Sequence, residues 1–320
     1  MARRDTPRFH GFLIVDKPAG WTSHDVVGKV RRLTRQRAVG HAGTLDPAAT
    51  GVLPIALGDA TKVLNAIEDS SKTYLAEITF GIETDTFDAD GRLTRIRDPN
   101  GLSLGTINNL LGAFRGTVSQ QAPRYSAIQR GGRRLYEMAR AGIEFEPPFR
   151  DVVIHDLQVI EFSAPVLTLC VDCGAGTYIR SLANDLGNAA GTGAHLSNLV
   201  RLRAGSFTLA TAWTFKDLQR IPHDSRWASV ALHPDSAIVQ TAAIILDEEG
   251  CSRWLAGRSI STGDIDPAAA IVRAYSVAGD WMGYGVPVLT IDGIVVQPRR
   301  VVDPASSGAE AESELRRITA

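Results

Sequence analysis

The residues most able to do chemistry lie in a glycine-rich segment, GHAGTLDPAATG at 40–51. Its glycines, threonines and Asp-Pro pair are typical of a tight loop between two regular elements. Asp46 in this loop has two interpretations: it caps a helix that starts at Pro47, or it is a nucleophile or general base that another group orients. In the second case His41 would act in catalysis, contact a phosphate or stack on a ring, and the spacing does not choose among these roles.

A group able to orient a carboxylate occurs in GTYIRSLANDLG at 176–187. The spacing predicts a helix that Thr177 caps. Its buried stripe is expected at Ile179, Leu182, Ala183 and Leu186. Arg180 falls in the first turn and off this stripe, where the helix dipole disfavours a cation by about 0.3–1 kcal/mol unless an anion compensates. That anion is a phosphate or a carboxylate, unless Arg180 is an ordinary surface residue.

Tyr74 belongs to an alternating pattern, KTYLAEITF at 72–80, that predicts a strand. Its ring shares a face with Ala76, Ile78 and Phe80, which is usual for a core residue. A tyrosine at the end of such a strand can equally form the wall of a pocket for a planar ring and keep its hydroxyl in water.

Two other motifs do not predict a metal site. Cys170 and Cys173 form a C-x-x-C, but Zn²⁺ needs a second pair of ligands, and Cys251 stands alone. The acidic stretch at 81–91 lacks the ligand spacing of a calcium loop. Phosphate-binding GxxxxGK[ST] and strand-embedded GxGxxG motifs are also missing from the sequence. We therefore expect no metal and no cofactor.

Basic residues gather in two zones although the net charge of the chain is only −1. Residues 1–40 hold nine lysines and arginines against three aspartates. A second zone holds Arg124, Arg130, Arg133, Arg134 and Arg140. Two such zones on an otherwise neutral protein fit a polyanion bound in one place, and ordinary solvated faces are the alternative.

The elements that must position these groups mix strands and helices without regular alternation. Strands are expected at 12–15, 52–57, 72–80, 151–160 and 165–171, and helices from Ser23 as a cap and at 104–114, 133–141 and 178–190. Several strands follow one another directly, which favours an α+β fold with a mainly antiparallel sheet over a doubly wound parallel one.

The 320 residues exceed what one hydrophobic core usually holds, so two domains are expected. A polar, proline-containing stretch at 220–236 marks the boundary. We predict a catalytic domain at 1–225, a small β-barrel at 238–303 and a flexible tail at 304–320. The chain has no apolar run of membrane-spanning length and no secretory signal, so a cytoplasmic protein is expected.

Five segments together resemble one known family. They are GFLIVDKPAGWTSHDVV (11–27), VGHAGTLDPAATGVLPIALGDATK (39–62), KTYLAEITFG with TDTFDADG (72–91), YSAIQRGGRRLYEMARAG (125–142) and GTYIRSLANDLG (176–187). In this order they are similar to the TruB family of tRNA pseudouridine synthases. The resemblance implies an antiparallel-sheet catalytic domain, a small C-terminal domain of the PUA kind, and isomerisation of uridine 55 in the tRNA T-loop without a cofactor.

The resemblance also implies roles for single residues. Asp46 would be the catalytic aspartate, Arg180 its ion-pair partner, and Tyr74 the ring that stacks on a uracil flipped out of its helix. The expected substrate contacts are His41, Tyr178, Leu199 and Lys17. Whether Asp46 attacks the sugar, attacks the base or removes the 2′ proton stays open. Val200 stands where relatives often have the first of two arginines, so one backbone contact of the family is not expected here.

Two other functions fit parts of the pattern. A non-catalytic protein that binds or folds tRNA would use the basic zones but would leave Asp46 without a task. A metal-dependent RNA hydrolase would use the acids at 81–91, but it needs ligand spacings that the sequence does not show. The expected partner is the T-arm of tRNA, with no membrane and no metal, and a monomer is the default.

Overall fold

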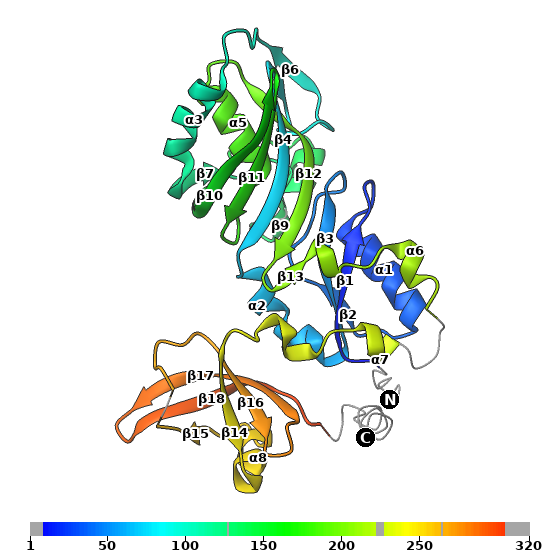
Figure 1. The fold of residues 1–320 in the computed structure, drawn as a ribbon, viewed down its shortest axis with the longest axis vertical. Helices are drawn as coiled ribbons and strands as arrows, with labels where there is room; N and C mark the ends of the chain where they lie inside the picture. Colours follow the sequence, from blue (N-terminus) through cyan, green and yellow to red (C-terminus); the bar gives the residue numbers. More distant parts are fainter. Residues whose placement is uncertain (1–8, 127, 222–226, 264, 305–320) are drawn as a thin grey trace.

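A nine-stranded mixed sheet forms the larger part of the computed structural model, which describes residues 9–126, 128–221, 227–263 and 265–304 (Figure 1). Its strands are β1 (Gly11–Lys17), β2 (Val39–His41), β3 (Thr50–Leu57), β4 (Lys72–Phe80), β7 (Gly116–Gln121), β10 (Phe149–Ser163), β11 (Val166–Cys173), β12 (Ala194–Ala204) and β13 (Phe207–Thr208). The order is β1-β3-β12-β4-β11-β10-β7, with β2 beside β3 and β13 beside β12. Only β12 and β3 run parallel among these neighbours, which confirms the mainly antiparallel α+β fold.

Helices and short ladders surround this sheet, and α3 and α5 lie on one of its faces (Figure 1). The helices are α1 (Ser23–Thr34), α2 (Leu64–Glu68), α3 (Leu104–Leu111), α4 (Leu135–Arg140), α5 (Ile179–Ala189), α6 (Phe215–Leu218) and α7 (Trp227–Val230). Four 3-10 turns are η1 (Gly58–Val63), η2 (Gly112–Phe114), η3 (Leu209–Thr211) and η4 (Pro234–Ala237). Two short ladders pair β5 (Ile82–Thr84) with β6 (Leu93–Ile96) and β8 (Gln129–Arg130) with β9 (Arg133–Arg134).

The caps of α1 and α5 differ from the sequence prediction. Helix α1 is capped by Thr22, which forms a capping box with Asp25, and not by Ser23. Helix α5 is preceded by Tyr178 without a side-chain cap, because the hydroxyl of Thr177 donates to the carbonyl of Gly174 instead. The predicted apolar stripe of α5 is buried as expected.

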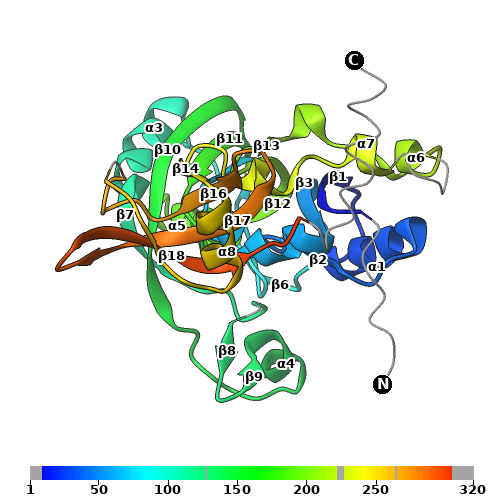
Figure 2. The same ribbon diagram turned by 90° about the horizontal axis from the view of Figure 1, so that it is seen from below.

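An arginine-bearing hairpin projects from the body of the protein (Figure 2). It consists of β8, β9 and α4, and it carries most of the second basic zone. Arg134 and Arg140 both lie over the ring of Tyr136, at 5.9 and 5.8 Å from its centroid. Such cation–π contacts hold the arginines on the hairpin surface and leave part of each guanidinium facing outward.

The C-terminal part is a curled five-stranded sheet with one helix (Figure 1). Its elements are β14 (Ala242–Leu246), α8 (Glu248–Leu255), β15 (Ile260–Ser261), β16 (Val272–Ser276), β17 (Trp281–Thr290) and β18 (Gly293–Val301). Its order is β14-β16-β17-β18-β15, and the edge strands β14 and β15 do not pair, so the sheet is a half-barrel. Ile238, Trp281 and Val302 join Phe12 and Ile14 in one buried cluster that connects this part to the large sheet.

The domain limits at 1–225 and 238–303 stay a prediction, and 305–320 of the expected tail lie outside the described residues. Within the described ranges, no helix has the length and apolar character that crossing a membrane requires.

Candidate active site

The loop between β2 and β3 carries Asp46 and is fixed at several points. The hydroxyl of Ser23 accepts from the backbone N of Leu45 at 3.0 Å and donates to its carbonyl at 3.2 Å. The carbonyl of Pro47 accepts from the backbone N of Gly20 at 2.9 Å. No helix begins at Pro47, so the helix-cap interpretation of Asp46 is wrong. Both neighbours of Asp46 are held by hydrogen bonds, while the side chain of Asp46 is 43% exposed.

Lys17 lies beneath this loop with none of its side chain exposed. Its ammonium donates to the carbonyls of Pro18, Trp21 and Pro47 at 3.0, 2.7 and 3.0 Å. Burial lowers the pKa of Lys17 to about 8, and the charge of Asp46 opposes that shift, so the amine remains mainly protonated at neutral pH. All three N–H bonds are used by the protein. In this structure the ammonium of Lys17 therefore supports the Asp46 loop, and its expected contact with substrate stays a prediction.

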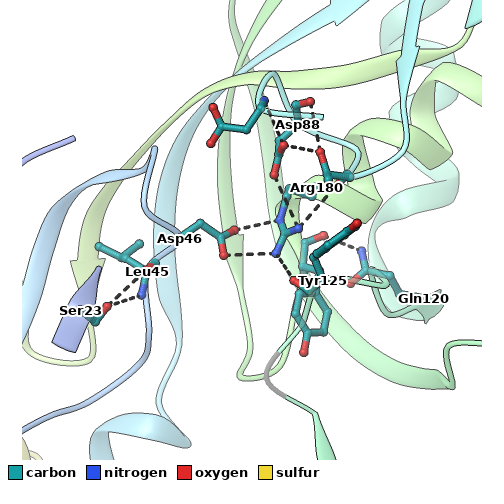
Figure 3. A network of polar contacts seen from close by, with 10 residues as sticks. Ser23, Leu45, Asp46, Asp88, Gln120, Tyr125 and Arg180 are labelled. Atoms are coloured by element: carbon teal, nitrogen blue, oxygen red, sulfur yellow. Dashed lines mark hydrogen bonds and ion pairs between the residues drawn. The ribbon is translucent and has the colours of Figure 1, made fainter. Parts of the chain in front are cut away.

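Arg180 meets Asp46 through two contacts (Figure 3). Its Nη2 donates to Oδ1 of Asp46 at 3.2 Å. Its Nε lies 2.8 Å from Oδ2, but the N–H bond does not point at that oxygen, so this contact is an ion pair rather than a hydrogen bond. The Arg180 side chain is only 6% exposed. A buried, planar guanidinium therefore orients a carboxylate that is open to solvent.

Three further groups hold the guanidinium of Arg180 in place (Figure 3). Its Nη1 contacts the carbonyl of Thr86 at 3.4 Å and Oδ2 of Asp88 at 3.6 Å, and Nη2 donates to the carbonyl of Tyr125 at 3.1 Å. Burial raises the pKa of Asp88, which the hydroxyl of Thr86 and the charge of Arg180 oppose. The sequence interpretation missed Asp88, although its position in the acidic stretch 81–91 was the available signal.

Tyr74, Leu199 and Arg201 lie on one face of the large sheet. Tyr74 on β4 pairs with Arg201 on β12, and Ala76 pairs with Leu199, so these side chains share a face. Burial raises the pKa of Tyr74, while the charge of Arg201 opposes this rise and that of Asp46 adds to it. The expected stacking ring, Tyr74, and the expected pocket residue, Leu199, therefore lie on the same face of the sheet. This part of the sheet borders the Asp46 loop, because β12 pairs with the start of β3.

Tyr178 stands directly before α5, two residues ahead of Arg180. Its backbone N donates to Oε1 of Gln120 at 2.8 Å, and its carbonyl accepts from Nε2 of Gln120 at 3.0 Å. Gln120 on β7 is buried and so fixes the start of α5. Sequence reasoning did not find Gln120, because a glutamine in a short polar strand carries no local signal for such a role.

His41 is the last residue of β2 and directly precedes the Asp46 loop. Its ring meets that of His24 edge to face, with centroids 5.4 Å apart. Its Nδ1 is buried, and none of the described residues offers it a hydrogen bond. Burial, followed by the charges of His24 and Arg201, lowers the pKa of His41 to about 4. The imidazole is therefore neutral at physiological pH, and its buried Nδ1 has no hydrogen-bond partner among the described residues.

This pKa predicts how stability depends on pH. Between pH 6.5 and about 4 the unfolded chain binds a proton at His41 that the folded chain does not. The free energy of unfolding should therefore fall as the pH drops through this window. Urea unfolding at several pH values should show a shallower fall in His41→Gln than in the wild type. The matched control, His155→Gln at an exposed histidine, should keep the wild-type slope, and equal slopes in all three proteins would contradict the prediction.

Acidic and thiol side chains do not assemble into a metal site in the described parts of the chain. Asp85 in the stretch 81–91 pairs with Arg92 at 3.0 Å, and Asp88 faces Arg180. Cys170 is half-buried and Cys173 is buried, and both are free thiols. Two of the three aspartates that the sequence places at 85, 88 and 90 are therefore paired with arginines.

Comparison with known proteins identifies the family. The model described as TruB family pseudouridylate synthase (N terminal domain) matches residues 31–179, and the model described as tRNA pseudouridylate synthase B C-terminal domain matches 180–235. A tRNA pseudouridine synthase B of Dehalococcoides mccartyi (strain CBDB1) is 42% identical over 82% of this chain and 87% of its own length. That of Synechocystis sp. (strain ATCC 27184 / PCC 6803 / Kazusa) is 40% identical over 92% of this chain and 99% of its own.

Solved structures share the fold at lower identity. A chain of an H/ACA RNP bound to a substrate RNA containing 2′-deoxyuridine aligns with a TM-score of 0.71 at 23% identity, over 93% of this chain and 86% of that one. A chain of a Cbf5-Nop10-Gar1 complex aligns with a TM-score of 0.70 at 23% identity, over 94% and 90%. These structures support the architecture, and the sequence relatives settle the family. The chain belongs to the TruB family of pseudouridine synthases.

Proposed function

We propose that this isomerase converts uridine 55 in the T-loop of tRNA to pseudouridine and that Asp46 is its catalytic carboxylate. The observation that carries the proposal is the pair formed by the exposed Asp46 and the buried Arg180. An arginine with little solvent access is a fixed support for an acid that must meet a substrate. The names of the relatives, tRNA pseudouridine synthase B, support tRNA as the substrate.

The reaction requires the base and the sugar to be positioned, and it consumes no co-reactant. The bond between N1 and C1′ breaks, a bond between C5 and C1′ forms, and one proton leaves C5 while another binds N1, so the atoms balance. The base must first leave its stack, which costs a few kcal/mol and calls for a new stacking partner. We assign this role to the ring of Tyr74, with Leu199 as an apolar wall. Attack on the sugar, attack on the base and removal of the 2′ proton would each use the carboxylate that Arg180 orients.

The exposed cations supply a surface for the tRNA backbone. Helix α1 presents Arg31 and Arg32, and Arg35 follows its last residue. The projecting hairpin presents Arg130 and Arg133. The root of this hairpin reaches the site itself, because the carbonyl of Tyr125 accepts from Arg180. Phosphate contacts on the hairpin and on α1 would hold a tRNA arm over Asp46.

The decisive assay uses unmodified tRNA transcript. We expect release of tritium from C5-labelled uridine to reach one equivalent per tRNA with the wild-type sequence and to disappear when position 55 is cytidine. A transcript with other T-loop uridines replaced should still react fully. Binding of tRNA without any release would favour the non-catalytic tRNA-binding function, and release that survives the change at 55 would refute the assigned position.

Metal removal gives a separate prediction. Because the proposed steps use Asp46, Arg180 and Tyr74 alone, full turnover is expected in excess EDTA with tRNA that has been folded beforehand. The control is tRNA folding itself, followed by native gel in the same buffer. A loss of turnover that Mg²⁺ restores while the tRNA stays folded would show that the reaction needs a metal.

A further inference from the structure

Arg201 is a buried arginine beneath the Asp46 loop. Its side chain on β12 is 1% exposed. Its Nε donates to the carbonyl of Val52 at 2.7 Å, and its Nη2 donates to that of Gly43 at 2.8 Å. Gly43 precedes Asp46 and Val52 follows it, so one planar guanidinium joins the two ends of the loop.

The charge of Arg201 is not used to neutralise an acid of the described structure. No carboxylate of the described residues forms an ion pair with it, in contrast to Arg180 and Arg203. Burial of a cation without an acidic partner is costly. Simple packing of the sheet would be served as well by an apolar side chain. The contacts with the two carbonyls and the interaction with the side chain of Tyr74 therefore distinguish this residue.

Two glycines of the loop lie where a side chain would push Arg201 away. Gly43 has φ +66°, and a Cβ there would be 3.2 Å from Nη1 of Arg201. Gly51 has φ +99°, and a Cβ there would be 2.3 Å from the carbonyl oxygen of Arg201. The loop therefore packs directly on this residue at both ends.

Arg201 also borders the strand of Tyr74. The two residues are cross-strand partners on β12 and β4, and β12 pairs in parallel with β3 at Gly51. Arg201 is thus the point at which the start of the loop, its end and the strand of the expected stacking ring meet.

We propose that Arg201 is a positioning residue that fixes the Asp46 loop against the strand of Tyr74 and so sets the place of the catalytic carboxylate. This inference rests on the proposed role of Asp46. A small displacement of Asp46 would slow the reaction without weakening contacts between distant arginines and the tRNA. The expected signature is a fall in kcat with little change in KM.

The test compares two arginines of the same strand. Arg203 makes hydrogen bonds to Ser71, Thr73, Gly205 and Asp172, none of them in the loop. Arg201→Met should lower kcat by at least about 100-fold with KM within about threefold, because misplacement of about 1 Å has effects of this size. Arg203→Met should lose stability but keep kcat within threefold. Arg201→Lys should recover little, because one ammonium does not reproduce the planar two-point contact.

A second pair of variants tests the contact between Arg201 and the loop by changing the loop residue Gly43. Gly43→Ala and Gly101→Ala both place alanine at a positive φ, +66° and +88°, but only the first meets Arg201, since Gly101 has open space around its Cβ position. Gly43→Ala should lower kcat at least tenfold, and Gly101→Ala should not. If Arg201→Met does not fold, the comparison of Gly43→Ala with Gly101→Ala tests the positioning role in its place.

The outcomes separate this proposal from the proposed function. Normal kcat in folded Arg201→Met, or in Gly43→Ala when Arg201→Met is unfolded, overturns the positioning role even if Asp46→Asn is inactive. A fully active Asp46→Asn overturns the proposed catalytic role of Asp46, on which this inference rests, whatever Arg201 does. Equal losses of kcat in Arg201→Met and Arg203→Met would reduce Arg201 to a general stabilising residue.

Discussion

Asp46→Asn is expected to lower turnover by at least about 100-fold, since removing a catalytic acid or base costs on the order of 10²–10⁴ and removing a catalytic nucleophile costs on the order of 10⁶. Asparagine keeps the shape of the side chain and one acceptor oxygen for Arg180. The affinity for tRNA should therefore stay within a few fold of the wild type. Single-turnover tritium release and filter binding on the same tRNA measure the two quantities.

The chain provides a matched control for this substitution. Asp172 also meets an arginine at two points, with Oδ1 and Oδ2 at 3.0 and 3.2 Å from Nη2 of Arg203. Its exposure, 38%, is close to the 43% of Asp46. Asp172→Asn breaks the same kind of pair outside the loop and should leave turnover within a few fold. Substantial turnover by Asp46→Asn, or an equal loss in both variants, would leave Asp46 as a structural residue.

The local features of this site could be predicted from the sequence, because glycines, Asp-Pro and helix spacing act over a few residues. They predicted a loop at Asp46 and an Arg180 that needs an anion near the first turn of a helix. The structure brings these two side chains into contact, while their catalytic roles remain predictions. The sequence also contains the capping box of Thr22 and Asp25, although the spacing alone predicts Ser23 as the cap.

The burial of Arg180 and the strand β12 could not be predicted in the same way. Thr86, Asp88 and Tyr125 cover Arg180 from segments that are distant in sequence, and periodicity reports only near neighbours. In β12 the register shifts twice, between Leu196 and Asn198 and between Arg201 and Arg203. Each shift changes which residues face the core, so the alternating pattern of a strand is lost and Arg201 resembles a surface charge.

Arg180→Lys should lower turnover at least about 100-fold, although it keeps the positive charge. An ammonium is a point charge and cannot contact both carboxylate oxygens in one plane. It also cannot keep the contacts of the guanidinium with Thr86, Asp88 and Tyr125. Arg203→Lys, the same substitution in the pair with Asp172, should leave turnover within a few fold and controls for a general loss of stability.

The salt dependence of tRNA binding distinguishes this role from a phosphate contact. An Arg180 that pairs with Asp46 neutralises no phosphate, so Arg180→Ala should leave the slope of log affinity against log salt unchanged. An Arg180 that binds phosphate would lower that slope by about one unit when truncated, and Lys would replace it well. Its 6% exposure and its contacts with two carboxylates favour the first case. Near-normal turnover in Arg180→Lys together with a reduced slope in Arg180→Ala would leave Asp46 without the partner that orients it.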